Sequence, residues 1–167
     1  MTKAIFVIDM QKICVGDAHH QFFKYDNDKL VASVNRVIEE NAGNPVVYIL
    51  NIMKDNFINK LAPFKAFEGS EAVELADKLE VVSDYIFKKY KGDAFTNPKL
   101  KEKLDELGVC EVEIVGVDGG GCVARTALGA IHAGYKVTLN SKAIGTMFCN
   151  KAEKYNRKLK KLGAAFK

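Results

Sequence analysis

Short apolar runs alternate along this chain with segments in which hydrophobic residues recur every three or four positions. The near-continuous apolar run at residues 3–9 is typical of a strand buried on both faces, as the strands of a parallel sheet are. Helical spacing follows at residues 30–38, between the capping candidates Asp26 and Asp28 and the stop signal Gly43. The same alternation predicts further strands at residues 45–50, 84–88, 111–117 and 135–140, and helices at residues 70–79, 98–107, 122–133 and 150–162.

Strands that alternate with helices predict an α/β fold. We expect a three-layer α/β/α sandwich with a mostly parallel, Rossmann-like sheet of five strands, and residues 164–167 leave room for a short sixth strand. With 167 residues the chain has the length of one domain, residues 1–167. No apolar stretch approaches the roughly 20 residues of a membrane span. The first residues show no signal-peptide pattern, so we expect a cytoplasmic protein.

The net charge of +4 is unevenly distributed, because residues 142–167 hold eight Lys or Arg and one acid. A basic segment of this kind could contact nucleic acid or an anionic partner. A solvent-exposed basic face on the last helix is the commoner explanation. We therefore expect neither a nucleic-acid nor a membrane partner.

Four cysteines are present: Cys14, Cys110, Cys122 and Cys149. None lies in a C-x-x-C pair, so neither a zinc ribbon nor a thioredoxin-type redox site is indicated. In a reducing cytoplasm all four should be free thiols.

Three predicted strands end next to residues with chemical capability. Asp9 closes the first strand, Lys89 follows the third, and Cys122 begins the helix after the fourth. Ligands of parallel sheets bind beyond the carboxyl ends of the strands, where these residues would meet. A helix N-terminus and a nearby ammonium should lower the pKa of the Cys122 thiol, and a carboxylate can accept its proton. Each residue alone also has a structural explanation: a turn cap, a solvated flank and a buried thiol.

Three glycines, residues 119–121, precede Cys122 and permit unusual backbone dihedrals. Backbone N–H groups in such a turn can converge on an anion, so this segment is suited to holding an oxyanion.

Three blocks in order resemble the isochorismatase-like cysteine hydrolases: IFVIDMQ (5–11), KYKGDAF (89–95) and GVDGGGCVARTALGAIHAGY (116–135). The resemblance implies that Asp9 is the general base, Lys89 stabilises charge and Cys122 is the nucleophile. It implies an oxyanion hole formed by the backbone N–H groups of Asp118 and Cys122, with a cis peptide bond between Val117 and Asp118. The implied reaction is hydrolysis of a small amide-type substrate through an acyl-thioester intermediate, without a cofactor.

The resemblance also implies that the first strand lies between the second and fourth, and that the chain forms a homodimer or larger homo-oligomer. Several positions depart from the family's usual pattern. Asp93 stands where Ser is usual, Gly119 where Thr is usual, and Gly129 where Asp is frequent, while residues 141–143 (SKA) replace a usual Asp-Ala. These departures affect the surroundings of the substrate pocket, and the identity of the substrate stays open.

Other classes of function are also compatible with parts of the sequence. Gly119, Gly121 and Ala124 match the spacing of a dinucleotide fingerprint, but the next strand lacks the expected terminal acid. A phosphotransfer or dehalogenase-type site on Asp9 and Lys89 would need a second acid where Gln11 stands. A non-catalytic or regulatory interaction protein on the same fold remains the main alternative.

No metal site is expected. Nicotinamidases of this superfamily carry Asp-x-His and a second His soon after the second strand, whereas residues 50–64 contain no His and only one carboxylate, Asp55. Transition metals normally need about three protein ligands. The roles of His19 and His20, in the loop after the first strand, stay open. We expect the pocket to be edged by four apolar residues of this segment: Ile52, Met53, Phe57 and Phe64.

Overall fold

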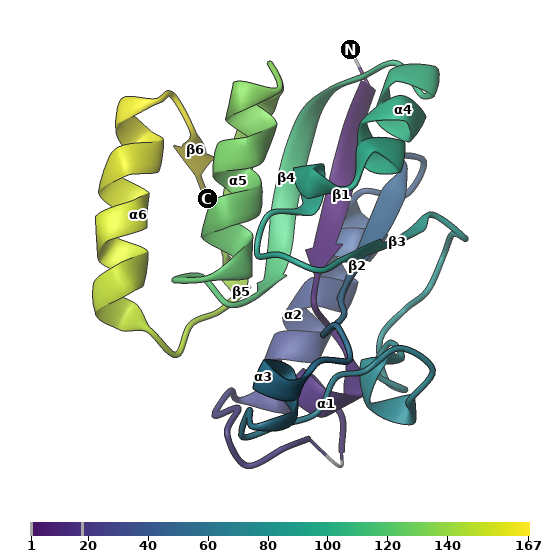
Figure 1. Cartoon of the computed structure of the whole chain (residues 1–167). Coiled ribbons are helices and arrows are strands. Elements are labelled where there is room, and N and C mark those ends of the chain that lie inside the picture. The colour runs from purple at the N-terminus through teal and green to yellow at the C-terminus, as the bar shows by residue number, and fades with distance from the viewer. Residues whose placement is uncertain (1, 18) are drawn as a thin grey trace.

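A computed structural model describes residues 2–17 and 19–167 (Figure 1). Six strands form one sheet in the order β3-β2-β1-β4-β5-β6, and every pair of neighbours is parallel. The strands are β1 (Thr2–Ile8), β2 (Val46–Asn51), β3 (Ile86–Lys89), β4 (Val109–Val117), β5 (Lys136–Gly145) and β6 (Ala165–Phe166). The predicted α/β fold, the position of β1 between β2 and β4, and the short sixth edge strand are confirmed.

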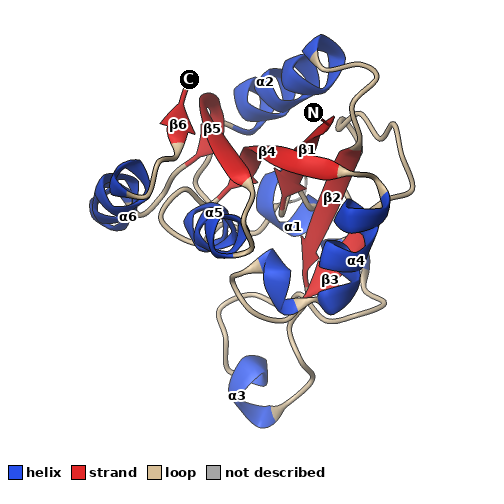
Figure 2. Cartoon of the chain, turned by 90° about the horizontal axis from the view of Figure 1, so that it is seen from above, coloured by secondary structure: helices blue, strands red, loops and turns tan. Residues whose placement is uncertain are grey.

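Helices cover both faces of the sheet (Figure 2). The helices are α1 (Lys12–Val15), α2 (Asn27–Glu40), α3 (Phe57–Lys60), α4 (Pro98–Glu106), α5 (Cys122–His132) and α6 (Cys149–Lys161), with 3-10 turns η1 (Glu71–Val73) and η2 (Ala94–Thr96). Buried residues of α1 and α2 form one hydrophobic core with one face of the sheet. Those of α4, α5 and α6 form a second core with the other face. None of the helices in the described parts of the chain is long and apolar enough to cross a membrane.

The predicted helix at residues 70–79 is wrong, because the structure has only the short turn η1 there. Backbone bonds to another segment replace helical ones: Lys12 N donates to Glu74 O, and Ala76 N donates to Met10 O. The segment's apolar side chains are buried by this irregular path instead of by a helical face.

The fifth strand is longer than predicted. It continues past Asn140, and after a register shift Ile144 and Gly145 pair with Gly116 and Val117 of β4. The four-residue helices α1 and α3 were not predicted, because they are too short to show a helical repeat. The start of α4 agrees with the sequence, since Asn97 caps it through its side chain and Pro98 occupies the first turn.

Candidate active site

Three groups from separate segments meet at the carboxyl-terminal edge of the sheet. Asp9 directly follows β1, with a positive φ of 52°, Lys89 is the last residue of β3, and Cys122 is the first residue of α5. Lys89 Nζ donates to Asp9 Oδ2 at 2.9 Å and lies 3.2 Å from Cys122 Sγ. Asp9 and Cys122 are 80 and 33 positions from Lys89 in the sequence, yet both lie within hydrogen-bond reach of its ammonium.

The ion pair in this cluster is almost completely shielded from water. Lys89 is 1% exposed and Asp9 is 5% exposed. The second carboxylate oxygen of Asp9, Oδ1, is buried and accepts no hydrogen bond from the described residues. A buried oxygen without a donor is costly, so Oδ1 is an acceptor available for a proton.

The expected low pKa of Cys122 is wrong for this arrangement. Burial, followed by the negative charge of Asp9, raises the pKa of Cys122 to about 12, and the ammonium of Lys89 offsets only part of this. Loss of the thiol proton to water is therefore strongly unfavourable at pH 7. Cys122 is thus a neutral thiol in this arrangement.

A proton transfer within the cluster avoids this cost. Burial raises the pKa of Asp9, and the charge of Lys89 opposes that rise. A raised pKa makes the Asp9 carboxylate a better proton acceptor. When the proton moves from Cys122 to Asp9, one cation and one anion are present both before and after the move. No additional charge has to be buried, so Asp9 can activate the thiol where bulk water cannot.

The turn before Cys122 is held by the side chain of Asp118. Its carboxylate accepts from Gly120 N at 2.8 Å, from Tyr25 Oη at 3.2 Å and from Met147 N. The backbone N–H groups of Asp118 and Cys122 donate to no backbone carbonyl in residues 2–17 and 19–167. The peptide bond between Val117 and Asp118 is cis, as the sequence resemblance implies.

Comparison with known proteins decides the family. The model of the isochorismatase domain matches residues 3–166. The chain belongs to the isochorismatase family. One relative, an uncharacterized isochorismatase family protein YddQ of Bacillus subtilis (strain 168), is 24% identical over 149 residues, which cover 87% of this chain and 79% of the relative.

Solved structures share the fold. An isochorismatase-like hydrolase from Alkaliphilus metalliredigens matches with a TM-score of 0.84 and 23% identity, covering 99% of this chain and 94% of that chain. N-carbamoylsarcosine amidase from Thermoplasma acidophilum matches at 0.84 and 24% identity, covering 100% and 96%. Pyrazinamidase of Pyrococcus horikoshii in complex with zinc matches at 0.86 and 23% identity, covering 100% and 99%.

Two residues at this isochorismatase-family site were not assigned a role from the sequence. Asn51, at the end of β2, accepts the third hydrogen bond of Lys89 Nζ through its Oδ1, at 2.9 Å. Gln11 holds that strand end, because its Oε1 accepts from Asn51 N at 2.9 Å and its Nε2 donates to Val73 O at 2.9 Å. In the sequence, only the position of Asn51 at the end of the strand next to β1 indicates that it could lie at the site. Gln11 lies inside the Asp-x-Gln block.

Asp93 and Gly129, two departures from the usual isochorismatase pattern, share one space in the structure. A Cβ atom built on Gly129 would lie 2.3 Å from Oδ1 of Asp93, so the Asp93 carboxylate occupies the space of a side chain at position 129. In the same way, a Cβ on Gly119 would lie 2.3 Å from Oγ1 of Thr146. A carboxylate and a hydroxyl are thus supplied from neighbouring segments where the family usually has Asp and Thr. The space beside positions 129 and 119 is therefore filled by side chains of other segments.

Exchanging the members of the first pair should show this coupling. Gly129→Asp alone would collide with Asp93, and we expect it to lower the free energy of unfolding by about 1–3 kcal/mol. Adding Asp93→Ser, which removes the colliding carboxylate, should recover most of that loss, because neighbouring substitutions are not additive. Urea denaturation of both single variants and the double variant measures the coupling. If the two substitutions changed the free energy of unfolding additively, positions 93 and 129 would not be coupled.

The apolar residues expected to edge the pocket lie in different surroundings. Ile52 is buried in the core on the α2 face, and Phe57 is 77% exposed on α3. Phe64 packs against Phe22 and Phe23 with ring centroids 5.3 and 4.8 Å away. Met53 forms an isolated bridge with Phe67. The prediction that the four form one rim is wrong for Ile52 and Phe57.

The residues present do not fit a transition-metal site like that implied by the zinc-bound pyrazinamidase. Asp55 pairs with Lys60 at 2.9 Å. His19 Nδ1 lies 2.8 Å from Asn27 Nδ2, and His20 Nδ1 accepts from the backbone N–H of Phe22. Within the described residues no three His, Cys, Asp or Glu side chains gather closely enough to hold an ion.

Proposed function

We propose that this chain is a cysteine-dependent hydrolase of a small amide-type substrate that acts through an acyl-thioester intermediate. One observation carries the proposal: Cys122, Lys89 and Asp9 lie within hydrogen-bond reach in a buried cluster, and an oxygen of Asp9 is left without a donor. Membership of the isochorismatase family supports it, as do fold neighbours that include N-carbamoylsarcosine amidase and pyrazinamidase.

The first half of the reaction follows from this geometry. Asp9 takes the thiol proton while Cys122 Sγ attacks the carbonyl carbon and forms a C–S bond. The negative charge moves to the carbonyl oxygen, which would accept hydrogen bonds from the backbone N–H groups of Asp118 and Cys122. When the C–N bond breaks, Asp9 returns its proton to the leaving nitrogen, so that an amine and a thioester result.

The second half repeats these roles with water. Asp9, again a carboxylate, removes a proton from a water molecule that attacks the thioester carbon. The C–S bond breaks, Cys122 regains a proton from Asp9, and a carboxylic acid is released. Lys89 keeps its positive charge throughout and balances whichever neighbouring group is the anion, with Asn51 fixing the position of its ammonium.

A non-catalytic interaction protein is less well supported. That alternative relied on the unusual residues around Cys122, but Asp93 and Thr146 refill the space at positions 129 and 119. A dinucleotide-binding turn is also disfavoured: a Cβ on Gly120 would lie 2.6 Å from Phe148 O, and Gly119 N donates to Gly145 O, so the turn is packed against the segment after β5.

The proposal is tested with a panel of small amides, carbamoyl compounds and nicotinamide, assayed for release of ammonia or amine with and without a chelator. We expect at least one compound to be hydrolysed by the wild type in the presence of chelator. Cys122→Ala should abolish turnover, whereas Cys149→Ala, which removes an exposed thiol, should keep it. Mass spectrometry of the quenched reaction should find the acyl group on Cys122. No turnover on any compound, or equal turnover by Cys122→Ala, would contradict the proposal.

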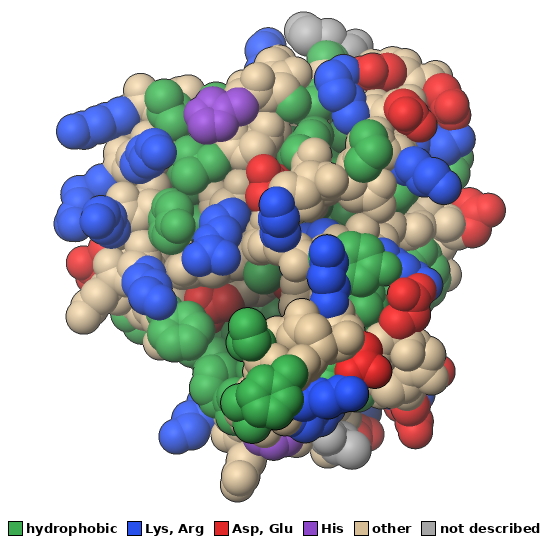
Figure 3. Space-filling model, viewed as in Figure 1, with side chains coloured by type: hydrophobic (Ala, Val, Ile, Leu, Met, Phe, Trp, Pro, Cys, Tyr) green, Lys and Arg blue, Asp and Glu red, His purple; other side chains and the backbone are tan. Residues whose placement is uncertain are grey.

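We also propose that the enzyme is cytoplasmic, because all four cysteines are free thiols. We further propose that it is a homodimer, because α3 and the residue after it expose large apolar side chains. Phe57, Ile58 and Leu61 are 77%, 77% and 72% exposed. Figure 2 shows α3 standing away from the sheet, and Figure 3 shows hydrophobic side chains gathered over it. Exposed apolar groups of this size favour a protein contact.

Light scattering should give about twice the 18.5 kDa chain mass at tens of micromolar. The double variant Ile58→Glu/Leu61→Glu should be monomeric, because a charge would have to be buried on each side of the contact. Leu162→Glu, at a 44% exposed position on another part of the surface, serves as the matched control and should remain a dimer. A monomeric wild type would rule out the dimer.

A further inference from the structure

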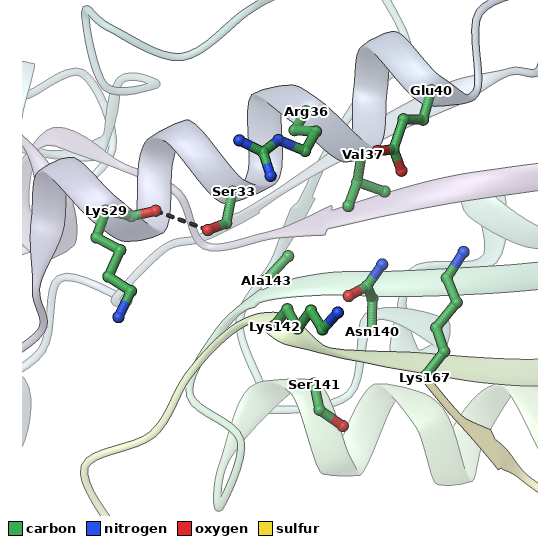
Figure 4. A pocket seen from close by; sticks show the side chains of 10 residues that line it. All are labelled: Lys29, Ser33, Arg36, Val37, Glu40, Asn140, Ser141, Lys142, Ala143 and Lys167. Atoms are coloured by element: carbon green, nitrogen blue, oxygen red, sulfur yellow. Dashed lines mark hydrogen bonds between the residues drawn. The ribbon is translucent and has the colours of Figure 1, made fainter.

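A cleft of about 660 Å³ lies between α2 and β5 (Figure 4). It is lined by side chains of α2, by residues 140–143 of β5 and by Lys167. The core on this face of the sheet includes α2, whereas α5, the helix that begins at Cys122, packs in the core on the opposite face. None of Asp9, Lys89 and Cys122 lines the cleft, so the cleft needs its own explanation.

Three cations face this cleft without a partner. Lys29 and Arg36 reach it from α2, and Lys142 reaches it from β5 (Figure 4). None of the three forms an ion pair with an acidic side chain of the described residues. Glu40 is the one carboxylate side chain among the residues that line the cleft. Lys142 lies in the stretch, residues 141–143, where the sequence departs from the family's usual Asp-Ala.

Asn140 of β5 and Ser33 of α2, which both line the cleft, offer hydrogen-bond acceptors. Asn140 is only 7% exposed, and its Nδ2 donates to Oε1 of the buried Glu113 at 3.0 Å. Lys3 and Lys167 pair with Glu113 at 3.0 and 2.8 Å, which keeps this carboxylate in place. Because its amide nitrogen is engaged, Asn140 has its Oδ1 left for a donor in the cleft. Ser33 Oγ donates to Lys29 O at 2.8 Å and keeps its acceptor capacity.

We propose that this cleft binds a phosphorylated small molecule that also carries hydroxyl groups, as sugar phosphates and nucleoside monophosphates do. Arg and Lys side chains bind phosphate oxygens, Arg through a planar pair of donors and Lys as a point charge. The hydroxyl groups of the ligand would donate to Asn140 and Ser33. The volume falls within the range of about 300–1,000 Å³ that is usual for small-molecule sites. The proposal is independent of the chemistry at Cys122.

Isothermal titration calorimetry with four probes tests this site: ribose 5-phosphate, AMP, inorganic phosphate and uncharged adenosine. We expect both phosphate esters to bind, inorganic phosphate to bind more weakly, and adenosine not to bind. The double variant Arg36→Glu/Lys142→Glu should weaken binding of the esters at least tenfold. Lys154→Glu/Arg157→Glu makes the same change of charge on exposed positions of α6 and should alter the affinity less than twofold.

Three outcomes would overturn the site. The first is no binding of either ester by the wild type at about 1 mM ligand, the weak end of specific affinities. The second is equal weakening by both double variants, which would indicate attraction to the overall charge. The third is a short single-stranded oligonucleotide that binds more tightly than AMP and is weakened by both double variants, which would indicate a nucleic-acid surface. If the charge-reversed variant does not fold, Lys142→Ala at an exposed position replaces it, with an expected weakening of at least threefold.

Discussion

Replacing Asp9 with asparagine should lower the pKa of Cys122 and at the same time slow turnover strongly. The negative charge of Asp9 is the second largest cause of the raised pKa of Cys122, after burial. In Asp9→Asn the ammonium of Lys89 would have the thiolate as its only anionic partner in the cluster. We expect the pKa of Cys122 to fall by at least about one unit, which corresponds to about 1.4 kcal/mol. Turnover should nevertheless fall by about 10²–10⁴, because the proposed proton acceptor and donor is lost.

The rate of alkylation as a function of pH measures this pKa, in a chain whose Cys110 and Cys149 are replaced by serine. The remaining thiol, Cys14, is buried, and burial raises its pKa well above the ordinary value, so it should react slowly. Asn51→Ala is a useful comparison, since it removes a neutral partner of Lys89 and leaves both charges of the cluster in place. A variant Asp9→Asn with an unchanged or higher pKa, or with substantial turnover, would show that Asp9 does not control the thiol.

Lys89→Met should have the largest effect on stability. Methionine has a similar length but no charge, so Asp9 would be left as a buried carboxylate without its cation. Breaking a buried pair in this way costs about 3–5 kcal/mol. Turnover should also be lost, because nothing would balance the thiolate. The double variant Asp9→Asn/Lys89→Met removes both charges and should recover much of the stability without recovering activity.

The stability of Lys89→Met should also depend on pH. Burial already raises the pKa of Asp9 in the folded wild type, and Lys89 opposes that rise. Without Lys89 the folded-state pKa should rise further above the unfolded value near 4. A group with a raised acidic pKa binds more protons in the folded state, so stability is present below the unfolded pKa and is lost as pH rises towards the folded pKa. Urea denaturation from pH 4 upwards should show this loss for Lys89→Met and not for the double variant.

The sequence predicted the positions of Asp9, Lys89 and Cys122 because strand ends and short motifs are local features. Parallel strands bring such ends to one edge of the sheet, and here they bring the three residues within hydrogen-bond reach. The protonation of Cys122 could not be predicted in the same way. It depends on how deeply the thiol is buried and on which charges face it. The expected low pKa took account of the helix N-terminus and of the Lys89 ammonium, but not of the negative charge of Asp9, which raises the pKa of Cys122.

Other failures have the same origin in contacts between distant segments. Residues 70–79 show helical spacing, but their backbone groups bond to Met10 and Lys12, which no local pattern indicates. Asn51 has no motif, and its role became visible only when its Oδ1 was found 2.9 Å from Lys89 Nζ. The two exchanges around Cys122, between positions 93 and 129 and between positions 146 and 119, also involve residues far apart in the chain.

Those exchanges have a consequence for protein engineering. Consensus substitutions, which restore the most frequent residue of a family, are commonly stabilising. In this chain the Cβ added by Gly119→Thr would lie 2.3 Å from Thr146 Oγ1, and the Cβ added by Gly129→Asp would lie 2.3 Å from Asp93 Oδ1. Both substitutions would therefore cause a steric clash. The safer unit of substitution is a pair of residues that share one volume, changed together. A substitution chosen from one sequence position alone would miss Asp93 and Thr146, which already occupy the space beside these glycines.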